Sequence, residues 1–421
     1  MLSQADNDAL CRVGPGTLMG NLFREYWLPA LQSGELPEPD SAPVRIMLLG
    51  EELIAFRDTN GAVGLVDNNC PHRRASLFFG RNEESGIRCV YHGWKFDVNG
   101  DCVDMPSEPA ESNFREKVKI KSYPCRERNG VIWAYMGPRA VLPALPELEG
   151  NMYPNHYISV LFRNNNWMQG IEGEIDTVHA AFLHSGAARP EDLPPQSFRY
   201  YMSKNRAGRF NVRETDAGTS YGMYRIAEED SYYWRIGHLL FPCFAMPPVP
   251  TLGEESRFLA YVPMDDEHTL EWSIGPGANE GLGAGFNAGR EYLGNGTGWY
   301  DRYVIEQNWD NDFQIDREAQ RTWKSWSGIA GVRQQDMAMT EGMGPILDRT
   351  SEHLGTTDQM IIRTRRRFLQ AARALAEDGT PPPGVEQPAA YHKRSGQIVM
   401  HRDADWWADT THLIERFEAK V

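Results

Sequence analysis

Apolar and polar positions alternate in short runs through the first third of the chain, and this pattern predicts β-strands. The apolar runs lie at 44–49, 52–56, 63–66 and 131–136. Asn60-Gly61 and Asn99-Gly100 are dipeptides that favour tight hairpin turns. Residues 41–150 are therefore predicted to form a small antiparallel β domain. An N-terminal segment, residues 1–40, precedes it and carries a short helical run at 19–26.

The pattern changes after a proline-rich segment at 143–154, which we interpret as a domain boundary. We expect strands between 198 and 275 and a glycine-rich loop at 276–299. Helices are expected at 165–181, 299–320 and 357–377. The third helix has the clearest end, because Gly379 and Pro381 follow it. Residues 151–421 are therefore predicted to be an α+β domain.

The chain has 421 residues and a formal net charge of −15, from 43 Lys and Arg against 58 Asp and Glu. Such a surface repels phosphate backbones and anionic lipids, so we expect neither nucleic acid nor membranes as partners. The sequence has no apolar run of about 18 residues and no signal-peptide pattern, so we expect a cytoplasmic protein. An anionic substrate would need local arginines that outweigh the overall negative field.

Two of the six cysteines belong to a metal-ligand pattern. Cys70-Pro71-His72 and Cys89-Val90-Tyr91-His92 are separated by sixteen residues, and both lie on turns between predicted strands. Two thiolates and two imidazoles suit either a zinc ion or a Rieske-type [2Fe–2S] cluster, in which two His replace two Cys on one iron. The single residue between Cys70 and His72 is a short gap for a zinc site, which favours the cluster.

A second metal site is indicated further along the chain, where His179 and His184 follow Asp176 in a predicted helix. Two His and one carboxylate form the ligand set that leaves open positions on Fe(II) for dioxygen and substrate. Because the two His are five residues apart, the helix must loosen or end between them for both to bind one ion. Spacing alone leaves the acidic ligand open among Glu172, Glu174, Asp176, Asp310, Asp312, Asp316 and Asp336.

These residues resemble those of a known family, the Rieske non-haem iron oxygenases, and more narrowly the oxygenase (α) subunits of its phthalate dioxygenase branch. The resemblance spans nearly the whole chain. It is carried by the opening motifs at 13–20 and 26–27, the cluster stretches 70–77 and 89–96, the segment 176–184, and the closing motif 335–345.

The resemblance implies a ligand set for each metal centre. Cys70 and Cys89 would bind one iron of the [2Fe–2S] cluster, and His72 and His92 the other. The mononuclear Fe(II) would be bound by His179, His184 and Asp336.

The resemblance also implies an assembly. Asp176 matches the family's aspartate that bridges the cluster of one subunit and the iron of its neighbour, here between His92 and His179. The implied assembly is a homotrimer, which in some members stacks into a hexamer.

The fold, the electron source and the reaction are implied in the same way. Residues 41–150 would be an antiparallel β Rieske domain, and residues 151–421 a catalytic domain with a central antiparallel sheet covered by helices, on which residues 1–40 pack. Electrons from NAD(P)H would come from a separate flavin and [2Fe–2S] reductase, directly or through a ferredoxin. With O2, the enzyme would cis-dihydroxylate an aromatic carboxylate or O-demethylate a methoxylated aromatic acid, in aromatic-compound catabolism.

Members of the branch act largely on aromatic carboxylates, so a basic side chain should hold the acid group. The predicted sheet region contains five candidates: Arg206, Arg209, Arg213, Arg225 and Arg235. Among these we expect Arg206 and Arg235 to bind the substrate. Arg235 directly follows the aromatic run 232–234, which suits an aromatic acid.

Two other classes of protein stay open at this point. One is a Rieske electron-transfer protein without a mononuclear iron, and the other is a zinc-stabilised binding protein. Assays for iron and acid-labile sulfide separate them, because the oxygenase needs a cluster plus one further iron, the electron carrier only the cluster, and the zinc protein neither.

Overall fold

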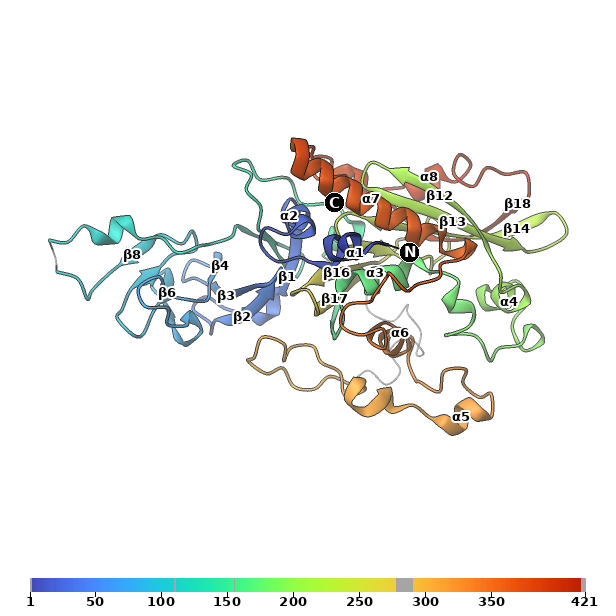
Figure 1. Ribbon diagram of the computed structural model, residues 1–421, viewed down its shortest axis with the longest axis horizontal. Coiled ribbons are helices and arrows are strands. Elements are labelled where there is room, and N and C mark those ends of the chain that lie inside the picture. Colours follow the sequence, from blue (N-terminus) through green and yellow to red (C-terminus); the bar gives the residue numbers. More distant parts are fainter. Residues whose placement is uncertain (1, 110, 155, 278–290, 418–421) are drawn as a thin grey trace.

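The computed structural model describes residues 2–109, 111–154, 156–277 and 291–417. The smaller part, which holds the strands between residues 44 and 104, lies at one end of an elongated molecule (Figure 1, lighter blue and cyan). One of its sheets joins β2 (Val44–Leu48), β3 (Glu51–Arg57) and β4 (Val63–Asp67). A second joins β5 (Arg81–Glu83), β6 (Gly86–Arg88), β7 (Lys95–Phe96) and β8 (Cys102–Asp104), and all pairs are antiparallel. The predicted antiparallel β domain is confirmed. Its hairpin at Asn60-Gly61 depends on glycine, because Gly61 has a φ of 85°.

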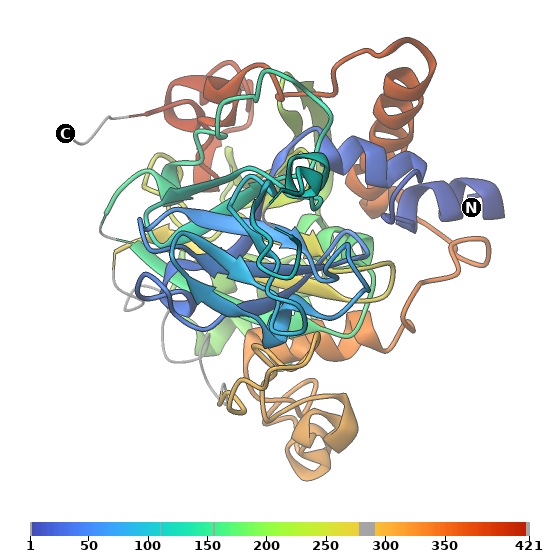
Figure 2. The same cartoon turned by 90° about the vertical axis from the view of Figure 1, so that its left-hand side faces the viewer.

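The N-terminal segment contacts both halves of the molecule. Helices α1 (Gln4–Cys11) and α2 (Leu18–Arg24) contact α7 (Gln359–Asp378) of the larger half. Strand β1 (Trp27–Gln32) instead pairs with β10 (Val131–Tyr135), which pairs with β9 (Cys125–Arg128). Figure 2 shows α1 and α2 beside α7 when the molecule is viewed from its β-rich end. The domain boundary at residue 40 stays a prediction.

The larger half is built on an eight-stranded antiparallel sheet. Its strand order is β11 (His156–Arg163), β17 (Thr269–Pro276), β16 (Phe258–Pro263), β15 (Phe244–Met246), β14 (Ser231–Leu240), β13 (Gly218–Ile226) and β12 (Arg209–Thr215), with β18 (Gly396–His401) paired to β14. The helices are α3 (Trp167–Ile175), α4 (Phe198–Lys204), α5 (Arg317–Arg321), α6 (Val332–Glu341), α7 and α8 (Thr411–Ile414). Helix α3 packs on β15 and β16, and α6 packs on α3. The predicted α+β class is confirmed.

The predicted helices had different outcomes. The one at 357–377 is α7, which ends at Asp378 because Gly379 adopts a left-handed conformation with a φ of 74°. The one at 165–181 is shorter, since α3 ends at Ile175. The helix expected at 299–320 is wrong. Residues 312–314 have φ angles near 50°, which an α-helix cannot accommodate, and they leave only a 3-10 turn before α5.

The largest apolar core is continuous between the two halves of the molecule. It includes Leu22 of α2, Trp133 of β10, Trp167 of α3, Phe244 of β15 and Phe368 of α7. A second core lies inside the smaller, β-rich part and contains Ile54, Phe56, Leu77, Ile87 and Phe96.

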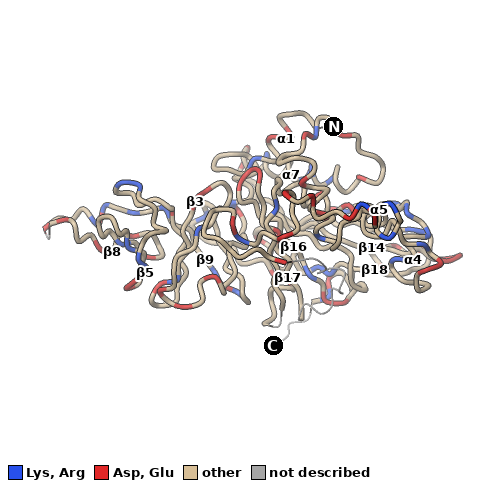
Figure 3. The backbone as a smooth tube through the Cα atoms, turned by 90° about the horizontal axis from the view of Figure 1, so that it is seen from below, with Lys and Arg blue, Asp and Glu red and all other residues tan. Residues whose placement is uncertain are grey.

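Charged residues of both signs are distributed along the whole length of the backbone (Figure 3). In the part of the chain that the structure describes, no helix is both long and apolar enough to cross a membrane. Most of the glycine-rich loop expected at 276–299 lies outside the described residues.

Candidate metal centres and substrate pocket

The two Cys/His pairs lie on two turns that are each closed by their own backbone. The Cys70 N–H donates to the Ala75 carbonyl at 2.9 Å, and the Cys89 N–H donates to the Trp94 carbonyl at 2.8 Å. The second turn also needs Gly93, whose φ of 82° is costly for other residues. Each pair is therefore positioned by a few neighbouring residues.

The thiols and the imidazoles form two separate groups. The Cys70 and Cys89 thiols lie within interaction distance, and burial raises the pKa of Cys70 to about 11. The His72 and His92 rings lie 4.4 Å apart between centroids, and the indole of Trp94 stacks on His72 at 4.4 Å. The buried Nδ1 of His72 has no hydrogen-bond partner among the residues that the structure describes, which leaves it available as a ligand atom.

This arrangement fits a two-iron cluster better than one zinc ion. Around a tetrahedral zinc, bonds of about 2.0–2.3 Å place the ligand atoms within about 4 Å of one another. Among the described residues, no three of Cys70, His72, Cys89 and His92 bring ligand atoms within 4.8 Å of one another. One thiolate pair and one imidazole pair match the two different irons of a Rieske cluster.

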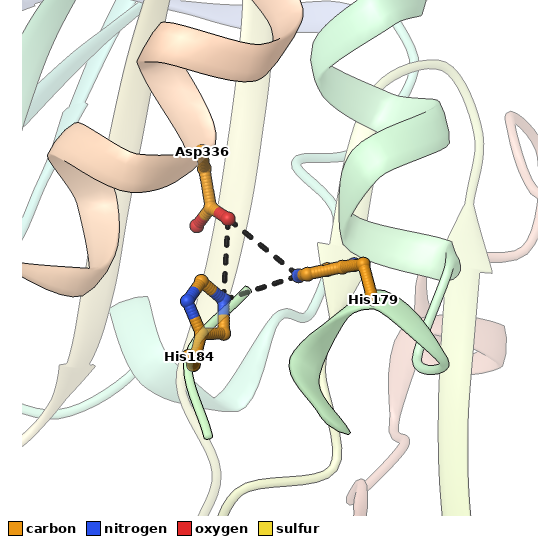
Figure 4. A group of neighbouring side chains, drawn as sticks. All are labelled: His179, His184 and Asp336. Carbon is orange, nitrogen blue, oxygen red and sulfur yellow. Dashed lines mark hydrogen bonds and ion pairs between the residues drawn. The ribbon is translucent and has the colours of Figure 1, made fainter. Parts of the chain in front are cut away.

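The second predicted ligand group does converge on one point (Figure 4). The Nε2 atoms of His179 and His184 lie 3.1 Å apart. Oδ1 of Asp336 lies 3.5 Å from Nε2 of His179 and 3.2 Å from Nε2 of His184. The His come from the chain after α3, whereas Asp336 comes from α6. The packing of α6 on α3 brings the ligands together, and the donor set fits a mononuclear Fe(II).

Asp176 determines how the chain leaves α3. Its Oδ1 accepts hydrogen bonds from the backbone N–H groups of Val178 at 2.9 Å and His179 at 3.3 Å. The helix therefore ends before His179, which begins a 3-10 turn. Because the helix ends here, His179 and His184 can both reach one ion although they are five residues apart. The second carboxylate oxygen of Asp176 lies 3.9 Å from Nδ1 of His179, too far for a hydrogen bond.

The other acidic candidates for the iron site have different partners. Glu172 is held by Arg349 at 2.9 Å and by Arg365 at 2.6 Å. Glu174 pairs with Arg333 and accepts a hydrogen bond from Tyr261. The side chain of Asp316 caps α5. Of the seven candidates, Asp336 alone belongs to the converging group found among the described residues.

Burial and charge act in opposite directions on the pKa values of this group. Burial favours the neutral carboxyl, but His184, His179 and Arg333 outweigh it and hold the pKa of Asp336 well below its usual range. Burial would lower the pKa of His184, but Asp336 raises it overall. Asp336 is therefore an ionised carboxylate, ready to bind a cation.

Two neighbours of Asp336 on α6 support the ligands. Nδ1 of His184 donates to Oε1 of Gln335 at 2.7 Å, and Nε2 of Gln335 donates to the Ile329 carbonyl at 2.8 Å. Arg333 lies 3.8 Å from Oδ2 of Asp336 and also pairs with acidic residues of α3 and β17. Sequence reasoning missed both supporting roles. The sequence could have indicated these roles, because Arg333 and Gln335 lie within three positions of the predicted ligand Asp336 on one helix.

A cavity of about 640 Å³ lies beside the three converging ligands. All three line it, together with Phe198 and Met202 of α4, Arg235 of β14 and the prolines 247 and 248. Three further arginines also line it: Arg199, Arg257 and Arg333. The cavity therefore combines a metal-ligand group with apolar walls and basic side chains, which is the usual character of a small-molecule site.

The five candidate arginines occupy different environments. Arg235 lines the cavity, and Arg225 is buried next to it in the sheet. Arg206 is absent from the lining; it donates to the Gly186 carbonyl at 2.9 Å, and its role in binding substrate stays a prediction. Arg209 and Arg213 are exposed on β12.

Comparisons with known proteins agree with this geometry. A family model for the Rieske [2Fe-2S] domain matches residues 26–124, and a model described as LigXa C-terminal domain like matches residues 134–420. The chain is 46% identical to the 3-chlorobenzoate-3,4-dioxygenase oxygenase subunit of Comamonas testosteroni, over 95% of this chain and 96% of that protein. It is 38% identical to the phthalate 4,5-dioxygenase oxygenase subunit of Pseudomonas putida, over 96% and 94%. The chain belongs to the Rieske oxygenases.

Further matches extend the likeness. The 5,5'-dehydrodivanillate O-demethylase oxygenase subunit of a Sphingobium species is 33% identical, over 99% of this chain and 91% of that protein. Among solved structures, Pseudomonas putida CBB5 NdmB matches with a TM-score of 0.60 at 17% identity, over 91% of this chain and 99% of that one. Dicamba monooxygenase matches with a TM-score of 0.57 at 16% identity, over 85% and 99%. The two structures show the shared fold.

Membership in the Rieske oxygenases decides between the classes that the sequence left open. The protein is an oxidoreductase and the oxygenase component of a system that oxidises aromatic substrates with O2. It contains a Rieske cluster and a mononuclear iron, and it takes electrons from a reductase or ferredoxin. The electron carrier without a second iron and the zinc-stabilised binding protein are therefore excluded.

Proposed function

We propose that this Rieske oxygenase cis-dihydroxylates an aromatic carboxylate whose acid group is held by Arg235. The observation that carries the proposal is a buried arginine in the cavity lined by His179, His184 and Asp336, with no acidic partner among the described residues. Ring dihydroxylation is supported by the names of the relatives at 46% and 38% identity, both of which are dioxygenase subunits.

Arg235 has the properties of an acid-binding residue. Only 5% of its surface is exposed, and Nη1 contacts the Met202 sulfur at 3.3 Å. Its Nε has no hydrogen-bond partner in the described parts of the chain. Its guanidinium lies 4.1 Å from the centre of the Phe198 ring. A substrate carboxylate would supply the missing acceptor, and the aromatic ring of the same substrate would pack on the apolar wall.

The other predicted site residues would bind the two metal centres. Cys70, Cys89, His72 and His92 would hold the cluster, and His179, His184 and Asp336 would hold the iron. Bound Fe(II) would supply the activation of O2 for insertion into the substrate. The support for these roles is the pairing of the four cluster ligands and the convergence of the other three.

We further infer that the working unit is a homotrimer in which Asp176 links neighbouring subunits. The cluster-bearing strands and helix α6 lie in opposite halves of one chain (Figure 1). Large apolar side chains are exposed beside both centres: Val90 and Tyr91 next to His92, and Phe182 and Trp326 near His179. Apolar surfaces of this kind are typical of subunit contacts. The carboxylate of Asp176 is partly exposed, as a bridge between subunits requires.

A product assay tests the proposed reaction. The purified protein is supplied with NADH, a flavin and [2Fe–2S] reductase, O2 and a panel of chlorinated, dicarboxylated and methoxylated benzoates. We expect a cis-diol from at least one acid. Formaldehyde from the methoxylated acids, with no diol from any acid, would overturn dihydroxylation in favour of O-demethylation. Oxidation of neutral aromatics alone would overturn the acid-binding role of Arg235.

A further inference from the structure

Two arginines lie next to each other in the sheet beneath α4. Arg225 is on β13 and Arg235 is on β14, where their respective cross-strand partners are Tyr233 and Met223. Because alternate residues of a strand share a face, Arg225 and Arg235 are diagonal neighbours on one face of the sheet. Their exposed fractions are 1% and 5%.

Neither guanidinium has a counter-ion within the described part of the chain. The Nε, Nη1 and Nη2 atoms of Arg225 are all buried without a hydrogen-bond partner, and so is Nε of Arg235. Several other buried arginines have acidic partners, among them Arg163 with Glu271 and Arg394 with Glu149. Burial and the charge of Arg235 lower the pKa of Arg225 to about 9, so it remains largely protonated at neutral pH.

The buried aromatic surroundings strengthen the positive electrostatic field of Arg225 and Arg235. Tyr233 lies opposite Arg225 on the neighbouring strand, and its ring stacks on Tyr201 of α4 at 5.0 Å. A buried charge without a partner is costly, and aromatic walls with little water reduce the screening of that charge. An anion in the cavity that Arg235 lines would offset the charge of both arginines at once.

We propose that Arg225 is a specificity-determining positioning residue: it adds a second positive charge behind Arg235, so that the pocket selects aromatic acids by their negative charge. Arg225 does not line the cavity and does not touch the substrate. Its repulsion of Arg235 also holds that guanidinium toward the cavity, where the acid group binds. This inference rests on the proposed acid-binding role of Arg235.

A ligand series that varies in charge tests the proposal. Benzamide, benzoate and phthalate carry no charge, one and two negative charges at neutral pH, and their dissociation constants are measured on the anaerobic holoenzyme. For Arg225→Met we expect no change with benzamide, about tenfold weaker benzoate binding and about a hundredfold weaker phthalate binding, because a Coulomb energy scales with ligand charge. Arg225→Lys should restore most of the loss. Arg213→Met, at an exposed arginine of β12, should leave all three constants unchanged.

The outcomes separate the possible causes. Equal weakening of the binding of all three ligands would mean that Arg225 only packs against the pocket. Unchanged dissociation constants would mean that the charge of Arg225 does not act on the ligand. Either result overturns the inference. If the wild-type protein binds benzoate and phthalate no better than benzamide, the proposed function itself fails. If Arg225→Met does not fold, Arg225→Gln, which keeps polar donors without the charge, carries the same test.

Discussion

The two metal centres differ in how the chain builds them. All four cluster ligands lie within residues 70–92, on two turns whose backbone hydrogen bonds involve their own neighbours. The iron ligands come from residues 179, 184 and 336, and they meet only because α6 packs on α3. The cluster site is therefore a local structure, whereas the iron site depends on tertiary packing.

This difference has a functional consequence. The local cluster site should tolerate many changes elsewhere in the chain, because its ligands and the backbone hydrogen bonds that close its turns all come from residues 70–94. The iron site should be sensitive to changes in the side chains that hold its ligands in place, among them Gln335 and Arg333. Variants of the catalytic half can therefore break one centre while the other serves as an internal control.

Asp336→Ala should have the largest effect. Without its only carboxylate, the ligand group loses the charge that attracts a cation, so we expect loss of the mononuclear iron and of all turnover. The cluster should keep its visible spectrum and its sulfide. Metal analysis of the purified variant checks this expectation. The control is Asp316→Ala, which removes a helix cap of α5 and should retain the iron. An Asp336→Ala protein with full iron content would show that the ligand set is wrong.

Asp176→Asn should reduce turnover by about a hundredfold, because the amide lacks the charge and one of the two acceptor oxygens that the proposed bridge between subunits requires. Asn retains an oxygen for the hydrogen bonds to residues 178 and 179, so both metals and the proposed trimer should be preserved. The expected defect is in electron transfer, seen in stopped-flow reoxidation of the prereduced cluster with substrate and O2. The exposed acid Asp310 provides the control variant Asp310→Asn. Wild-type reoxidation in a metal-replete Asp176→Asn trimer would refute the bridging role.

Gln335→Leu should weaken metal binding at the iron site by about 10–100-fold, because His184 loses the acceptor that fixes its ring. Titration of the iron-depleted protein with Co(II) measures this affinity without turnover. Gln335→Glu, which keeps an acceptor, should bind Co(II) more tightly than the Leu variant. Identical affinity of the wild-type and Leu proteins would mean that Gln335 does not hold His184.

Arg235→Met should raise the KM for an aromatic acid by at least about tenfold, since loss of one partner of a buried charge pair costs about 2–5 kcal/mol. Both metal centres should remain intact, because Arg235 contacts none of their ligands. Steady-state kinetics with the best acid of the panel, alongside the cluster spectrum, checks this. A KM within about twofold of the wild-type value would remove the main support for acid binding by Arg235.

The sequence predicted the local features better than the distant ones. The strands of the cluster domain, its hairpins and helix α7 depend on nearby turn and cap residues, which are visible in the sequence. The spacing of the histidines predicted that the helix must loosen or end between His179 and His184, whereas the helix already ends at Ile175, before both of them. Spacing alone could not choose among seven acids, because the meeting of Asp336 with His179 depends on the packing of α6 on α3. The helix predicted at 299–320 is wrong because residues 312–314 adopt left-handed conformations, which the acid-rich pattern does not reveal.

The metal content of the intact protein tests the central claim most directly, that one chain combines a local cluster site with an iron site built by packing. Iron, zinc and acid-labile sulfide are measured on the same anaerobically purified sample. The account predicts about three iron atoms and two sulfides per chain, with no stoichiometric zinc. Equal amounts of iron and sulfide in the fully metallated protein would contradict the second site, and zinc without sulfide would contradict both.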